Sequence, residues 1–98
     1  MKRQYTQEEV VANYASAIKR LLPAVLKNTL EDRAFVERLV TQHILANDLE
    51  PTEDNLYAAF KHHYRVLPWQ IKLAVLLREE ENDRVNVNKI RRGFSSTF

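Results

Sequence analysis

The chain has 98 residues, of which 45% are hydrophobic and 29% charged, a composition typical of one globular domain with a modest core. It contains no cysteine, one glycine and three prolines, which excludes disulfides and thiol chemistry and disfavours an all-β fold with a turn at every corner. We expect a cytoplasmic protein, because the N-terminal residues lack the apolar run of a signal peptide and no segment has the length of a membrane span.

Charge is unevenly distributed, although the net charge is only +2. Residues 1–30 carry five basic and two acidic side chains, residues 31–60 carry two basic and seven acidic, and residues 61–98 carry eight basic and four acidic. A duplex-binding domain usually has a more one-sided basic excess, because each phosphate contact needs its own cation. An acidic middle between two basic ends therefore favours a protein partner or internal ion pairs.

The first helix is expected over residues 7–22. It opens with Thr6-Gln7-Glu8-Glu9, a capping box in which the Thr6 hydroxyl and the Glu9 carboxylate bond free amides of the first turn. Pro23 should end or kink the helix, because proline has no amide hydrogen to continue the bonding pattern. One face carries the apolar residues Val10, Val11, Tyr14, Ala15, Ile18, Leu21 and Leu22.

Two further helices are expected over residues 31–47 and 52–65. Glu31 and Asp32 suit the positive end of the helix dipole at the first of them. Pro51 marks the break, and Thr52 is a suitable N-cap for the next helix. The expected core-facing residues are Phe35, Val36, Leu39, Val40, His43, Ala46, Leu56, Ala59, Phe60 and His63.

A fourth helix is expected over residues 68–82, with Pro68 at its first position, where no amide donor is required. It is apolar on two faces, one with Trp69, Leu73, Leu76 and Leu77 and the other with Ile71 and Val75. Either this helix is central to the bundle, or one face is kept for a partner. The segment Leu67-Pro68-Trp69 also has two interpretations: a helix start with Trp69 as a core anchor, or a turn displayed for recognition. We take Leu67, Pro68, Trp69, Ile71 and Val75 as candidate partner-binding residues.

The C-terminal stretch is basic and carries Lys89, Arg91 and Arg92. These three residues are further candidates for partner contacts, the alternative being a solvated end without a binding role. Residues 93–98 are expected to be disordered. The predicted fold is thus all-α, a single compact bundle of four main helices with a basic, partly disordered C-terminal tail.

Neither a catalytic nor a metal site is predicted. The carboxylates lie at helix starts or in the acidic run 79–83, and the sequence has no nucleophile elbow and no phosphate-binding glycine loop. His62 and His63 are adjacent, so on a helix they would point about 100° apart, and His43 belongs to another helix. We therefore expect no enzyme, no cofactor and no metal.

In its length, helical make-up and the Leu67-Pro68-Trp69 turn, the chain resembles the anti-RecBCD accessory protein of lambdoid temperate phages. The resemblance implies docking on the RecC subunit of the host RecBCD helicase–nuclease in the host cytoplasm. It also implies that a host cyclophilin-type prolyl isomerase engages Pro68, and that the nuclease and recombination activities of the complex are altered. The alternative is a small helical DNA-binding accessory protein that uses its basic ends, although few groups here could read base edges.

Overall fold

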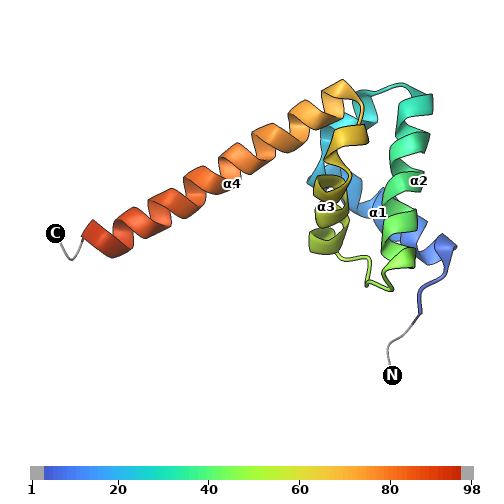
Figure 1. The fold of residues 1–98 in the computed structure, drawn as a ribbon, viewed down its shortest axis with the longest axis horizontal. Helices are drawn as coiled ribbons and strands as arrows, with labels where there is room; N and C mark the ends of the chain where they lie inside the picture. Colours follow the sequence, from blue (N-terminus) through green and yellow to red (C-terminus); the bar gives the residue numbers. More distant parts are fainter. Residues whose placement is uncertain (1–3, 96–98) are drawn as a thin grey trace.

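The computed structural model describes the backbone of residues 4–95 and the side chains of residues 4–83. This part of the chain is all-α, as predicted, and Figure 1 shows three helices packed together with a long fourth helix running outward from them. None of the described helices is both long enough and apolar enough to cross a membrane. The elements in chain order are α1 (Gln7–Leu21), the 3-10 helix η1 (Pro23–Lys27), α2 (Leu30–Ala46), α3 (Glu53–His62), the 3-10 helix η2 (Tyr64–Val66) and α4 (Trp69–Ser95).

Threonine caps begin the first three helices. At α1 the predicted capping box is confirmed: the Thr6 hydroxyl accepts from the Glu9 amide at 3.1 Å, and the Glu9 carboxylate accepts from the Thr6 amide at 3.2 Å. Thr52 caps α3 as predicted, accepting from the amide three residues on at 3.1 Å. Thr29 does the same for α2, so that helix begins at Leu30. Each cap satisfies an amide that has no partner within its helix.

The segments that connect the first three helices contain a proline and one residue with a left-handed backbone conformation. Pro23 ends α1, as predicted, and opens the short 3-10 helix η1. Between α2 and α3 the chain passes through Asp48 at φ 52°, a left-handed conformation that aspartate tolerates better than most residues. The helix expected over 52–65 is divided, because α3 ends at His62 and the 3-10 turn η2 follows.

The core lies between α1, α2 and α3 and is closed by η1 and the beginning of α4. Phe60 is completely buried, and its ring stacks on Tyr14 with the centroids 6.2 Å apart. Most predicted core positions are confirmed, but Ala15 and Ala46 are exposed, while Ala17 and Ile44 are buried in their place. The buried hydrophobic residues are Val10, Tyr14, Ala17, Ile18, Leu21, Leu22, Val25, Val36, Val40, Ile44, Leu56, Tyr57, Ala59, Phe60, Leu67, Ile71 and Val75.

The direction of α4 is set by contacts near its beginning. Ile71 and Val75 join the core, and Arg78 donates a hydrogen bond to the Leu21 carbonyl at the end of α1 at 3.0 Å. The same guanidinium lies 5.1 Å from the centre of the Tyr57 ring on α3, a cation–π distance. An ion pair of 3.2 Å between Lys61 and Glu79 also joins α3 to α4.

Beyond these contacts α4 continues to Ser95, well past the end expected near residue 82. Residues 93–95, which we expected to be disordered, are therefore part of the helix. Residues 96–98, the rest of that expected tail, lie outside the described residues. The acidic run 79–83 lies within α4 and does not break it, because glutamate is a good helix former.

Candidate functional site

The most distinctive surface of the described molecule is an apolar face of α4 formed by Trp69, Leu73, Leu76 and Leu77, here called the α4 face. Trp69 is 74% exposed, and the three leucines are 43%, 49% and 56% exposed. Their spacing of four, three and one residues keeps them on one side of the helix, over about two turns. The helix therefore presents large hydrophobic side chains to the solvent where a surface helix normally carries polar ones.

The opposite face of α4 is the one that packs, which reverses part of our assignment. Leu67, Ile71 and Val75, predicted to bind a partner, are only 4%, 0% and 2% exposed, so in this structure they belong to the core. The interpretation of Trp69 as a core anchor is likewise wrong, since its side chain is largely exposed. Helical periodicity reveals two apolar faces, but only the placement of α4 against the other helices decides which face is covered.

Pro68 lies immediately before the α4 face. Its side chain is half-buried, and its carbonyl accepts hydrogen bonds from the Ile71 and Lys72 amides at 3.0 and 2.9 Å. All described peptide bonds are trans, including the bond between Leu67 and Pro68. The turn is thus an ordered helix start that leaves part of the proline and most of Trp69 accessible.

The described basic side chains are in part engaged within the protein. Arg20 forms an ion pair of 2.7 Å with Glu53, and Lys61 and Arg78 make the α3–α4 contacts given above. The predicted contact residues Lys89, Arg91 and Arg92 are in α4, but their side chains lie outside those that the structure describes.

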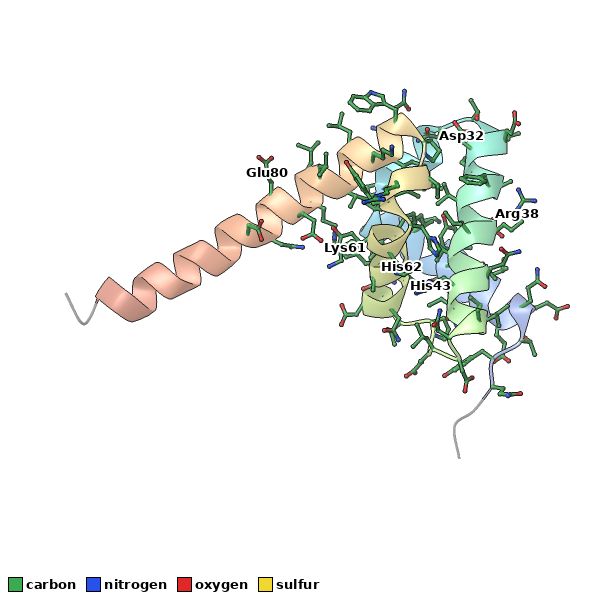
Figure 2. All side chains as sticks on the ribbon, viewed as in Figure 1. Asp32, Arg38, His43, Lys61, His62 and Glu80 are labelled. Atoms are coloured by element: carbon green, nitrogen blue, oxygen red, sulfur yellow. The ribbon has the colours of Figure 1, made fainter. Side chains whose placement is uncertain are left out.

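A second feature, missed by the sequence analysis, is a cluster of His43, His62 and His63 between α2 and α3. One ligating nitrogen from each ring lies within 4.8 Å of the other two, and His43 Nδ1 is 3.2 Å from His63 Nε2. The ring centroids are 4.7 to 5.1 Å apart. Figure 2 shows His43 and His62 approaching each other from the two helices. The prediction that the adjacent histidines point apart is therefore wrong.

The backbone explains why the prediction of diverging rings failed. Only His62 belongs to α3, because His63 is the C-cap, with φ −100° and ψ 20°, and starts the turn into η2. The 100° rule applies within a helix and not across its end. The available signal was the pair's position at the expected end of a helix, together with a third histidine on the neighbouring one.

Burial and mutual repulsion affect the charge of this cluster. Removal from water lowers the pKa of His43, and the neighbouring His63 and His62 lower it further. Burial lowers the pKa of His63 as well, with a smaller contribution from His62. Each of these shifts disfavours the imidazolium form. Two of the three rings therefore favour the uncharged form, which can accept a hydrogen bond or ligate a metal ion.

No family model, curated protein or solved structure matches this chain. Two features of the described surface bear on function, the α4 face and the histidine cluster. The α4 face offers large apolar contact area next to an accessible proline, and the cluster offers three nitrogen ligands.

Proposed function

We propose that this chain is a non-enzymatic binding protein that docks on a partner protein through the α4 face. The observation that carries the proposal is the exposure of Trp69, at 74%, together with three leucines on the same side of one helix. Tryptophan is enriched among the residues that dominate the energetics of protein interfaces. Apolar side chains at such helical spacing are also the ones with which an amphipathic helix contacts a hydrophobic groove of its partner.

The apolar side chains of the α4 face are unfavourable in water, and covering them with a partner lowers the free energy. Burying apolar surface contributes about 25 cal/mol per Å², so an aromatic ring and three leucines together supply several kcal/mol of gross interaction. Contiguous apolar patches on soluble monomers commonly mark interaction sites. The rigid helix adds to this, because its side chains lose little backbone freedom on docking.

For the partner itself, we follow the resemblance to the phage anti-RecBCD accessory protein. It implies that the α4 face contacts the RecC subunit of the host RecBCD helicase–nuclease, with an effect on its nuclease and recombination activities. It also implies that a host cyclophilin-type prolyl isomerase engages Pro68. This is supported by the accessibility of Pro68 and by its position next to Trp69, which would bring an isomerase bound there beside the docking face.

The alternative, direct DNA binding by the basic ends, receives less support. Three of the described cations, Arg20, Lys61 and Arg78, are already engaged within the fold, which leaves fewer positive charges for phosphates. DNA binding also predicts a distinct salt response. Affinity that depends on six or more phosphate contacts falls by roughly 10³-fold or more between 50 and 200 mM salt, whereas an apolar interface is far less sensitive.

The test uses immobilised full-length chain and purified RecBCD at 50 and 200 mM salt. Three chains are compared: wild type, Trp69→Ala, and Arg38→Ala as a control for loss of a long exposed side chain. Figure 2 shows Arg38 on the side of α2 that faces away from α4. We expect capture by the wild type and by Arg38→Ala at both salt concentrations, and loss of capture by Trp69→Ala.

Each part of the proposal can fail separately. Absence of RecBCD capture by the wild type overturns the choice of partner. Equal capture by Trp69→Ala and the wild type overturns the role of the face. Sedimentation provides a further check, because a dimer that dissociates in Trp69→Ala would mean that a second copy of the chain covers the face.

A further inference from the structure

We propose that His43, His62 and His63 bind one zinc ion, which joins α2 to the turn between α3 and α4. This site is separate from the α4 face and does not depend on the function proposed for that face. It draws one ligand from α2, one from the last residue of α3 and one from the turn that follows, and a bound ion would hold these three side chains at fixed distances from one another.

The distances suit a small tetrahedral ion. Zinc bound by histidine at about 2.0–2.1 Å places neighbouring ligand nitrogens about 3.3–3.4 Å apart. His43 Nδ1 and His63 Nε2 are 3.2 Å apart, close to that separation before any ion is bound. All three ligating nitrogens lie within 4.8 Å of one another. The remaining gap of roughly 1.5 Å is within the range of a side-chain rotation, and His62 is exposed and free to turn.

The ligand types select the class of metal. The cluster consists of three imidazoles and contains no carboxylate, which disfavours calcium and magnesium, since both prefer oxygen ligands. Imidazole suits zinc, copper and nickel, and zinc accepts a tetrahedral arrangement without a geometric preference of its own. Three protein ligands leave a fourth coordination position for water or for a side chain of a bound partner.

The surroundings allow an ion to enter. His62 is exposed, whereas His43 and His63 are half-buried, so the protein covers one side of the cluster and solvent reaches the other. A shallow hollow of about 350 Å³ adjoins it, lined by Lys61, His62, His63, Tyr64, Arg65 and Val66. Neutral rings are the form that binds a metal, and burial of His43 and His63 favours that form.

Without an ion, the same 3.2 Å contact is a hydrogen bond in which one ring nitrogen donates to the other. The two interpretations make different forecasts for His62. A hydrogen bond between His43 and His63 does not need the third ring, whereas a zinc site loses one of three ligands when His62 is replaced. His62→Ala is therefore the decisive variant, and its exposed position makes it the one best tolerated by the fold.

The experiment is calorimetric titration of the tag-free full chain with zinc chloride, alongside cobalt(II) absorption as a report of tetrahedral geometry. His62→Ala, His43→Ala and His63→Ala are compared with Gln42→Ala, a control at an exposed position next to His43. We expect one ion per chain in wild type and Gln42→Ala, with a higher melting temperature in zinc. Since losing even an outer-shell partner typically weakens metal binding about 10- to 100-fold, each histidine variant should weaken it by at least about tenfold.

Three outcomes would overturn the zinc site. The first is no binding by the wild type. The second is equal affinity of wild type and His62→Ala. The third is weak binding of several ions that no histidine variant alters. Circular dichroism verifies folding, and if His43→Ala fails to fold, the comparison of His62→Ala and His63→Ala with Gln42→Ala still decides the question.

Discussion

Replacement of Trp69 by alanine should separate the docking surface from the core. The side chain is 74% exposed, so only about a quarter of its surface is covered in the free chain. An aromatic residue of this size can bury about 150–250 Å², and a quarter of that, at about 25 cal/mol per Å², amounts to roughly 1–1.5 kcal/mol as an upper limit. We therefore expect Trp69→Ala to lower the free energy of unfolding by no more than that.

Phe60→Ala is the matched comparison within the core. Its ring is completely buried and stacks on Tyr14, so truncation leaves a cavity and should cost about 3–5 kcal/mol. At Trp69 the larger effect should be on partner binding and not on stability. An interface hot spot contributes about 2 kcal/mol or more, which corresponds to a dissociation constant raised at least about 30-fold in Trp69→Ala.

Stability is measured by urea unfolding followed by circular dichroism. Tryptophan fluorescence cannot serve for all variants, because Trp69 is the only tryptophan and Trp69→Ala removes that fluorescence. The urea midpoint and slope are compared among wild type and both variants. In the wild type, tryptophan fluorescence should also shift to shorter wavelength as the partner covers the ring. The reasoning is refuted if Trp69→Ala destabilises the protein as much as Phe60→Ala, or if it binds the partner with wild-type affinity.

Four further predictions concern other parts of the molecule. Ile71→Ala should destabilise the protein by about 2–5 kcal/mol in urea unfolding, because this residue is completely buried; an unchanged midpoint would contradict its place in the core. Thr6→Ala should cost about 1 kcal/mol through loss of the capping box, and thermal melting with no decrease would contradict the cap. Pro68→Ala should keep the helix content, because alanine suits a helix start, but abolish co-purification with the isomerase; unaltered co-purification would dismiss Pro68 as the contact. Burial, with the Glu79 carboxylate, raises the pKa of Tyr57 from 10.0 to about 12, so its contribution to stability is full below pH 10 and is lost as the pH rises toward 12. Urea unfolding at pH 8 and 11 should show this loss, and Tyr57→Phe, which cannot ionise, should show a smaller one.

The local features of this fold could be predicted from the sequence because each depends on a few neighbouring residues. The Thr6 capping box and the Thr52 cap require only a hydroxyl and the following amides, and both form as expected. Pro23 ends the helix that precedes it, since proline has no amide hydrogen to bond back to that helix. The faces of α1 and α3 were largely identified because each helix has one dominant apolar stripe.

The candidate sites could be predicted only in part. The sequence indicated that the helix beginning at Pro68 has two apolar faces, but Ile71 and Val75 were assigned to the partner, whereas the structure buries both and leaves Leu73 exposed. The histidine cluster was missed altogether. Its convergence depends on where α3 ends and on how α2 lies beside it, and neither follows from the spacing of His62 and His63.

The sequence by itself determined the class of fold, the position of most helix starts and the absence of cysteine chemistry, because these depend on composition and on contacts over three or four residues. Only the tertiary structure decided which side of α4 is covered and which three imidazoles share one space. Both depend on side chains far apart in the chain, such as Arg78 with the Leu21 carbonyl and His43 with His63. Their juxtaposition is set by the packing of whole helices, which a local pattern does not specify.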